Sequence, residues 1–520
     1  MTDKQIASYC VFPRLNLDKF ISDELYATKI IELVKSGVGG FCIFGKVKLD
    51  DVQKVINGLQ NIAKEKLLFS ADFEFGLPMR LLEGTAFPHA MALGKTGDEK
   101  SAFYAAQLIG RESKEIGIDW IFAPVCDINS NKNNPIINIR SFGENEEIVG
   151  KFAAAFALGL HESGIISTAK HFPGHGDTDL DSHLELPVVN GSKERLENLE
   201  LKPFKKLIKN GVKSIMLGHL AVPAFDTSLT PASLSKPIIQ DLLIKELGFD
   251  GIIISDALEM KSISNNYSSG LASELSLRAG NHIALIPEDA SEAISHLESI
   301  IKNDLDFKNE LIAKAEKIRE LIKWTDSRPI PKVDGLRKDR FLQHEKFALQ
   351  IARKTIEIRA PKILTPIDNK KQVAAFAFLQ SDSSFPNASM FFNLLQSATE
   401  NDIDFGFVNH ELKEDDLVAL RSGITESDVV IFANFYKSHA YSGNIGFADK
   451  LGEIQHRLAG GIPRINLFFG NPYLDDQLRS DMSVKAFSDS LCSLASVVML
   501  LTGRELGEDG EDATKQNYSK

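Results

Sequence analysis

The stretch Gly251–Met260, with the sequence GIIISDALEM, shows the pattern that decides the fold. Three consecutive isoleucines form a short apolar run, which is typical of a strand buried on both faces, and the run stops at Ser255 and Asp256. A residue at the carboxyl end of such a strand lies on the rim of a barrel or in the crevice of an open sheet. An aspartate there can also cap the following helix, so the pattern alone leaves the role of Asp256 open.

Similar apolar runs recur through residues 1–290, and stretches with helical spacing separate them. This alternation predicts an α/β fold with a parallel sheet. Because the number of predicted strands approaches eight, we expect a (β/α)8 TIM-type barrel, with a doubly wound open sheet as the alternative. The predicted strands are Gly39–Phe44, Leu67–Ala71, Trp120–Pro124, Ile165–Ala169, Ser214–Leu217, Gly251–Ser255 and His282–Ile286, with a weaker one at Tyr9–Phe12.

The pattern changes after the barrel. We expect residues 1–330 to form the catalytic barrel and residues 331–355, which follow a charged helical stretch and begin within the proline-bearing segment SRPIPKVDG, to form a linker region. Residues 356–505 are predicted to form a smaller C-terminal α/β sandwich with an open sheet, and residues 506–520 a polar tail. The strands expected in this sheet are Gln372–Leu379, Phe405–Val408, Val429–Phe435 and Ile465–Phe469.

Charge and composition exclude several classes of partner. The 59 Lys and Arg residues against 71 Asp and Glu give a formal net charge of −12, so there is no overall cationic field to attract nucleic acid or anionic lipid. We see no secretory signal and no window near the ~20 apolar residues that a bilayer span needs. The four cysteines, none in a CxxC pair, fit a reducing compartment, and we expect a cytoplasmic protein.

The segment Ala169–Val189, AKHFPGHGDTDLDSHLELPVV, is unusually rich in ionisable residues. One hypothesis is a divalent metal site, but Pro173 and two glycines break the helix that would align ligands four residues apart. Its ligands would be His171, His175, Asp179 and His183. A second hypothesis is a dyad in which Asp181 orients His183 for proton transfer, and a third is an inert solvated loop. The sequence favours the dyad and predicts neither a metal nor a cofactor.

Together, KHFPGHGDTDLDSH and GFDGIIISDALEM resemble glycoside hydrolase family 3, in particular its β-N-acetylglucosaminidase branch. The resemblance covers roughly residues 10–320 and implies a (β/α)8 barrel followed by an α/β sandwich domain. Further pieces stand in the expected order: FAPVCDIN (Phe122–Asn129), RSFG (Arg140–Gly143), MLGH (Met216–His219), PASLS (Pro231–Ser235) and LRAGNHIALIP (Leu277–Pro287).

The resemblance also implies roles for individual residues. Asp256 matches the catalytic nucleophile, and Asp181 with His183 matches the dyad of this branch, in which the histidine is the general acid/base. The positions that match sugar-binding residues are Asp72, Arg140, Lys170 and His171.

Two positions depart from the pattern of the family. In the family, the acidic residue at the position of Asp72 is usually followed by Gln-Glu-Gly-Gly-Arg, whereas in the run Asp72–Arg80 the arginine is displaced to Arg80. His282 stands where an aspartate is common.

The expected function is that of a retaining exo-β-N-acetylglucosaminidase, which hydrolyses terminal β-linked N-acetylglucosamine through a covalent glycosyl-enzyme, for example on cell-wall muropeptides during recycling. Because a neutral imidazole does not repel an anionic acceptor, phosphorolysis on the same site is an alternative. A metal-dependent hydrolase and a non-catalytic sugar-binding protein are the others.

Overall fold

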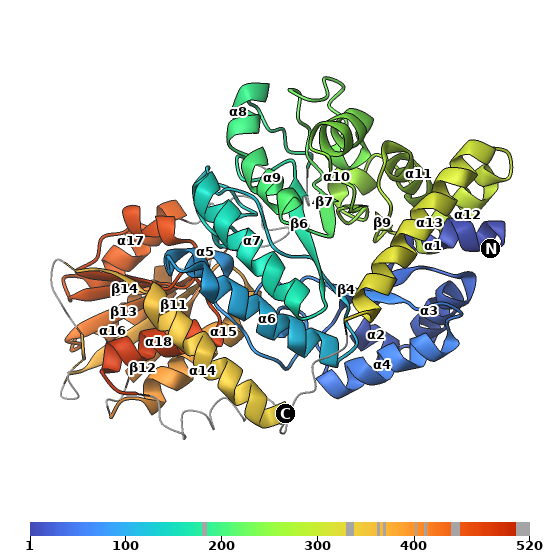
Figure 1. The fold of residues 1–520 in the computed structure, drawn as a ribbon. Helices are drawn as coiled ribbons and strands as arrows, with labels where there is room; N and C mark the ends of the chain where they lie inside the picture. The colour runs from blue at the N-terminus through green and yellow to red at the C-terminus, as the bar shows by residue number, and fades with distance from the viewer. Residues whose placement is uncertain are drawn as a thin grey trace. The chain divides into compact units, whose positions relative to one another are not determined.

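The computed structural model describes residues 1–178, 185–328, 337–360, 365–367, 371–400, 403–409, 412, 414–437 and 448–505. The chain divides into two compact units (Figure 1). The first consists of Met1–Thr85 and Asp98–Arg337, and the second of Ala86–Gly97 and Lys338–Lys520. No helix among the described residues is both long enough and apolar enough to cross a membrane.

Parallel strands form the centre of the first unit. Seven of them pair in chain order: β2 (Arg14–Asn16), β3 (Gly40–Phe44), β4 (Leu68–Ala71), β5 (Trp120–Ile121), β6 (Ile166–Phe172), β7 (Ser214–Leu217) and β8 (Ile252–Ser255). The ring is completed by β1 (Val11–Phe12), which pairs with β9 (Ala284–Leu285), and by a bridge from Ile254 of β8 to Ile283. Because only Pro13 separates β1 from β2, the two form one interrupted strand. The predicted barrel is confirmed, and the open sheet was the wrong alternative.

Helices surround these strands (Figure 1). They present apolar faces at helical spacing, as in α4, which buries Val52, Val55, Ile56 and Leu59. The helices of this unit are α1 (Asp3–Tyr9), α2 (Leu17–Ser22), α3 (Glu24–Ser36), α4 (Leu49–Ile62), α6 (Glu99–Glu115), α7 (Glu146–Glu162), α8 (Lys193–Asn198), α9 (Leu201–Lys209), α10 (Lys261–Ser264), α11 (Ser269–Ala279), α12 (Ala290–Ile301) and α13 (Leu305–Asp326). The shorter 3-10 turns η1 (Leu77–Met79), η2 (Asn138–Arg140) and η3 (Ala232–Leu234) and the π-helix η4 (Pro237–Glu246) complete it.

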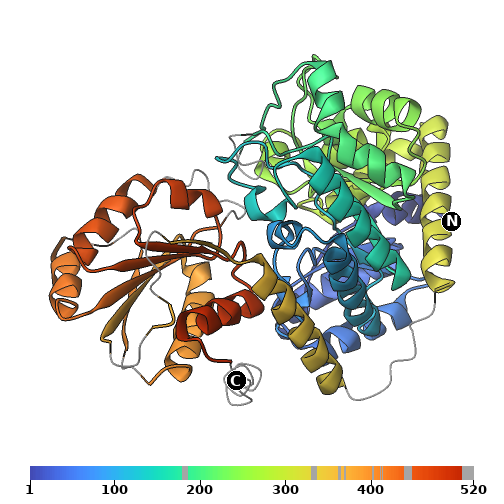
Figure 2. The same ribbon diagram turned by 60° about the vertical axis from the view of Figure 1, so that its left-hand side comes forward.

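The second unit is a six-stranded sheet between two layers of helices (Figure 2). Its strand order is β10-β15-β14-β13-β11-β12, all parallel except β10 at the edge. The four predicted strands are confirmed as β11 (Val373–Leu379), β12 (Ile403–Val408), β13 (Val429–Phe435) and β14 (Arg464–Phe468). Two strands of this sheet were not predicted from the sequence: β10 (Glu357–Arg359), which is exposed along its length, and the short β15 (Met482–Lys485).

The two faces of this sheet follow the alternation of side chains along the strands. In β11, Val373, Ala375 and Ala377 pack with α15 (Phe385–Ser397) and α18 (Leu491–Thr502), while Phe376 and Phe378 pack with α16 (Glu414–Gly423) and α17 (Ala448–Ala459). The unit also contains α5 (Ala90–Lys95), α14 (Arg337–Thr355), η5 (Asp382–Ser384) and η6 (Pro472–Asp476). Residues 337–355 of the expected linker region therefore form a helix.

Candidate active site

A network of carboxylates and cations lies at the carboxyl ends of β4 and β6. Lys170 belongs to β6, which runs to Phe172 rather than ending at Ala169 as predicted. Its side chain is 2% exposed, and its Nζ lies 2.9 Å from Asp72 Oδ1 and 2.8 Å from Glu74 Oε1. Burial by itself lowers the pKa of Lys170, but the two carboxylates more than offset this and hold it above its usual value. The lysine is therefore a fixed cation at the barrel mouth.

Arg140 joins the same network from the segment after β5. Its Nε and Nη2 donate to the two carboxylate oxygens of Glu74 at 3.0 and 2.8 Å, a bidentate pairing, and Nη1 donates to the carbonyl of Ile136. Glu74 is buried, which raises its pKa, yet Arg140 and Lys170 hold that pKa well below the ordinary value. Glu74 thus connects two of the predicted sugar-binding residues.

Arg80, the arginine displaced in the sequence, still contacts Asp72. Arg80, which follows η1, donates from Nη2 to Asp72 Oδ2 at 2.7 Å. Burial raises the pKa of Asp72, but Lys170 and Arg80 lower it below its usual range, so this residue is an anion held between two cations. The longer loop between Asp72 and Arg80 therefore still brings a guanidinium to this aspartate.

Asp127 holds two histidines, His171 in β6 and His175 in the turn after it. It lies two residues after Val125, which forms a parallel β-bridge with Lys170. Its fully buried carboxylate accepts from the backbone N of His171 and of His175, and from His171 Nδ1 at 2.7 Å. Burial raises the pKa of Asp127, while His171 and His175 lower it below its ordinary value. An ionised carboxylate only accepts hydrogen bonds, so His171 carries a proton on Nδ1.

His175 and Thr178 belong to the part of the 169–189 segment that the structure describes. Both are buried, and His175 Nδ1 lies 2.8 Å from Thr178 Oγ1. Burial lowers the pKa of His175 to about 4, so the imidazole is neutral near pH 7. Asn134 donates to the carbonyls of His175 and Gly176. This described part of the segment is therefore packed into the protein and not solvated.

Asp256 directly follows β8, as predicted from GIIISDALEM. Its backbone N donates to Leu217 O at 2.9 Å, and its Oδ1 accepts from the N of Ala257 at 2.8 Å. The next helix, α10, begins at Lys261 with Met260 as its N-cap, so the helix-capping interpretation of Asp256 is wrong. His219 donates from Nε2 to the carbonyl of Ala257 at 2.9 Å and so holds the turn that presents Asp256.

Asp181 and His183 lie outside the described residues, and their predicted dyad stays a prediction. Asp179 also lies outside the described residues. Two of the four residues of the metal hypothesis, Asp179 and His183, are therefore not described. Within the described ranges, no three or more His, Cys, Asp or Glu side chains form a group that could hold a metal ion.

The structure thus brings Asp72, Arg140 and Lys170 into one hydrogen-bonded network, with His171 next to Lys170 in the chain and held by Asp127. The sequence analysis gave no role to Glu74, Asp127 and His219. Each of them stands inside a quoted segment: the run after Asp72, FAPVCDIN and MLGH. Only their contacts show that they position other residues.

Comparison with known proteins agrees with this architecture. The model of the glycosyl hydrolase family 3 N terminal domain matches residues 19–321. Beta-hexosaminidase A of Pseudoalteromonas piscicida is 36% identical over 273 residues, which are 48% of this chain and 46% of that protein. A beta-hexosaminidase of Hydrogenovibrio crunogenus is 32% identical over 272 residues, 50% of this chain and 75% of that protein. The chain therefore spans about half the length of the first of these relatives.

Among solved structures, a glycoside hydrolase family 3 beta-N-acetylglucosaminidase from Paenibacillus sp. str. FPU-7 is similar over almost the whole chain. The TM-score is 0.84 at 27% identity, with 97% of both chains covered. Fold and site together define an α/β-barrel protein whose mouth is lined by paired carboxylates, cations and histidines. The chain belongs to glycoside hydrolase family 3.

Proposed function

We propose that the protein is a retaining exo-β-N-acetylglucosaminidase that releases terminal β-linked N-acetylglucosamine. The observation that carries the proposal is that Asp72 after β4, Lys170 in β6 and Arg140 in η2 meet in one network on the barrel rim that also carries Asp256. A rim of this kind is where barrel enzymes hold their substrates. The names of the similar beta-hexosaminidases support the choice of sugar.

In the proposed mechanism, Asp256 attacks the anomeric carbon and forms a covalent glycosyl-enzyme. His183, oriented by Asp181, gives a proton to the leaving oxygen and then takes one from the attacking water. An imidazole with an unperturbed pKa near 6.5 serves both steps around neutral pH, which a carboxylate does only when its pKa is raised. Water as the acceptor makes the reaction a hydrolysis.

The sugar-binding part of the mechanism rests on opposite hydrogen-bonding properties. Lys170 and Arg140 donate, and Asp72 accepts, so adjacent hydroxyl groups of one ring find both kinds of partner. Because His171 keeps its proton on Nδ1 toward Asp127, its Nε2 is the atom that faces a ligand.

Cell-wall muropeptides in a recycling pathway are the natural substrate class we propose, with the cytoplasm as the compartment. All four cysteines are unpaired and buried, which supports a reducing compartment.

The test is an assay with a chromogenic N-acetyl-β-glucosaminide and its β-glucoside counterpart. Asp256→Ala is expected to lose at least about 10³-fold in kcat, because no covalent intermediate forms. His183→Ala is expected to lose about 10²–10⁴-fold. Asp241→Ala, at an exposed aspartate of η4, is the matched control and should behave like the parent.

Product analysis separates the alternatives. Retention requires that the β-anomer of N-acetylglucosamine appears first in a proton NMR time course. Formation of a sugar 1-phosphate in phosphate buffer would show that the reaction is phosphorolysis and not hydrolysis. Loss of activity in the presence of a chelator would indicate a metal-dependent hydrolase. Equal turnover by the parent, Asp256→Ala and His183→Ala would contradict the site assignment, and binding without turnover in the parent would leave a sugar-binding protein.

A further inference from the structure

A cavity lies at the other end of the barrel from Asp256. Its volume is about 300 Å³, and it opens beside the amino ends of β8 and β9. His282 and Ile253 line it from the barrel, and Lys314 and Lys317 line it from α13. Nothing in the proposed reaction uses these residues, and His282 is one of the two positions where this chain departs from its family.

His282 offers a neutral hydrogen-bond donor to this cavity. It is 8% exposed, and its Nδ1 accepts from the backbone N of Ile253 at 3.0 Å. Burial, together with Lys314 and Lys317, holds its pKa well below the ordinary value, so the ring is neutral and carries its proton on Nε2. No hydrogen bond of this Nε2–H to any described residue is present.

The two lysines add positive charge without a fixed counter-ion. Lys314 and Lys317 are one turn apart on α13 and both are partly buried, yet neither forms an ion pair or hydrogen bond with any residue in the described part of the chain. Burial lowers the pKa of Lys314, Cys10 and Glu310 raise it in part, and Lys317 lowers it again, so that the pKa stays below its usual value. Asp250, which also lines the cavity, and Glu310, one turn before Lys314, are exposed and form no ion pair with these lysines.

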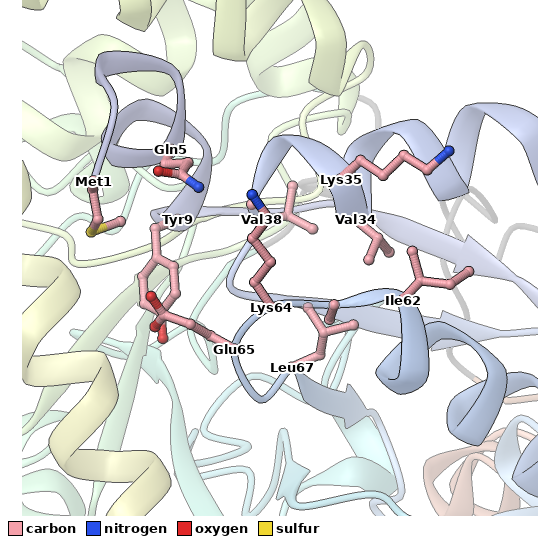
Figure 3. A pocket seen from close by; sticks show the side chains of 12 residues that line it. Met1, Gln5, Tyr9, Val34, Lys35, Val38, Ile62, Lys64, Glu65 and Leu67 are labelled. Carbon is pink, nitrogen blue, oxygen red and sulfur yellow. The ribbon is translucent and has the colours of Figure 1, made fainter.

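A cavity of similar size near the amino ends of β3 and β4 shows the contrast. It measures about 270 Å³ and is lined by Tyr9, Lys35, Lys64 and Glu65 (Figure 3). The lysines there are exposed, and Glu65 supplies a negative charge that Arg319 binds at 2.7 and 2.9 Å. Of these two cavities, both lined by described residues, the one at His282 combines partly buried, unpaired cations with a buried donor.

We infer that the cavity at His282 binds a small oxyanion with two negative charges, such as inorganic phosphate or the phosphate group of a monosaccharide phosphate. Two ammonium groups and one N–H donor match the charge and the acceptor oxygens of such a group. The volume holds one small ligand. An aspartate at position 282, as is common in the family, would itself pair with the lysines; histidine leaves their charges available to a ligand.

The experiment measures the rate at which each lysine of the full chain is acetylated by limiting acetic anhydride. Peptide mass spectrometry quantifies the acetylation of Lys314 and Lys317. Phosphate at about 20 mM should slow the modification of Lys314 and Lys317 about fivefold or more for a dissociation constant of a few millimolar, since protection follows 1 + [L]/Kd. Lys323, exposed on the same helix, is the internal control and should react at an unchanged rate. Sodium chloride at equal ionic strength replaces phosphate in the reference arm.

Variants separate the proposed site from other anion effects. His282→Asp should abolish the protection, because its carboxylate still accepts from Ile253 N but pairs with the lysines. The double variant Lys314→Met with Lys317→Met should lose the rise in Tm that phosphate gives the parent, whereas Lys323→Met should keep it. Neither change should alter glycosidase turnover, so the outcome does not depend on the proposed function.

The second arm replaces inorganic phosphate by glucose 6-phosphate, with glucose as the uncharged control. Protection by both phosphates would show that the cavity recognises the oxyanion itself. Protection by the sugar phosphate alone would show that its ligand is a monosaccharide ester. No protection by either compound at about 20 mM, or protection that survives His282→Asp, would overturn the inference.

Discussion

A single buried carboxylate, that of Asp127, fixes the orientation of His171, which we propose contacts the sugar. It binds two backbone N–H groups and the Nδ1 proton of His171. Asp127→Asn keeps the size but removes the charge, so the ring loses the partner that fixes its tautomer. We expect kcat/KM to fall about 10–100-fold, because the ring is no longer held in one orientation. Steady-state kinetics at pH 7 measure the loss.

A matched control distinguishes positioning from a general loss of stability. Asp119 is also buried, but it lies just before β5 at the amino end of the barrel and pairs with Lys114 and Lys66. Asp119→Asn should lower the free energy of unfolding and leave kcat/KM of the folded protein unchanged. If both variants lose activity in proportion to their stability, Asp127 has no separate positioning role.

At this scale, the sequence predicts the residues that end strands better than the residues that support them. Asp72, Lys170 and Asp256 could be placed on the rim because each follows or ends an apolar run. Glu74 and Asp127 could not be assigned from spacing, since their partners Arg140 and His171 lie 66 and 44 residues away in the chain. The return of Arg80 to Asp72 likewise depends on the path of the intervening loop.

At the scale of elements, the turn after β6 packs directly on the segment after β5. The Cβ of an alanine at Gly176 would lie 1.6 Å from the carbonyl oxygen of Ile128, so the turn must move to accept it. Because the proposed dyad follows on the same segment, Gly176→Ala should lower kcat about 10²-fold or more, while a competitive inhibitor that binds only the sugar network loses less affinity. Kinetics and inhibitor titration on one preparation give both values.

Gly58, inside α4, provides the control for this substitution. A Cβ there meets nothing within 4 Å. Gly58→Ala should leave kcat unchanged and raise the free energy of unfolding by up to about 1 kcal/mol, because alanine favours the helix. Equal kcat values for the two alanine variants would contradict the packing argument.

The elements that could be predicted are those whose apolar pattern is continuous. Strands β3 and β8 of the barrel and β11 and β13 of the second unit bury all or almost all of their residues, so their apolar runs predict them. Strand β2, in which only Leu15 is buried, was not predicted. Strand β10 is exposed at all three residues and pairs antiparallel with β15 only through the fold of the second unit. The end of β6 was placed too early because Lys170 and His171 are polar, although both are buried.

At the scale of the whole molecule, the two tryptophans make the unfolding of the barrel visible on its own. Trp120 and Trp324 both lie in the first unit, so tryptophan fluorescence follows that unit in a chain whose two units need not unfold together. His161, at the end of α7, packs edge-on against Trp324 with 5.5 Å between ring centroids. This histidine therefore couples the pH to both the stability and the fluorescence of the barrel.

Burial, with help from Lys213 and Arg328, lowers the pKa of His161 to about 4. The unfolded chain, with a histidine pKa near 6.5, then binds more protons than the folded one between pH 6.5 and 4, so stability falls as the pH falls through this window. From pH 7 to 5 this group should lower the free energy of unfolding by about 2 kcal/mol, and His161→Gln should remove that part of the loss. Urea titrations followed by tryptophan fluorescence measure the change, and His456→Gln, at an exposed histidine of the second unit, should keep the parent's pH dependence. A pH dependence that His161→Gln leaves unchanged would mean that the protonation of His161 is not coupled to barrel unfolding.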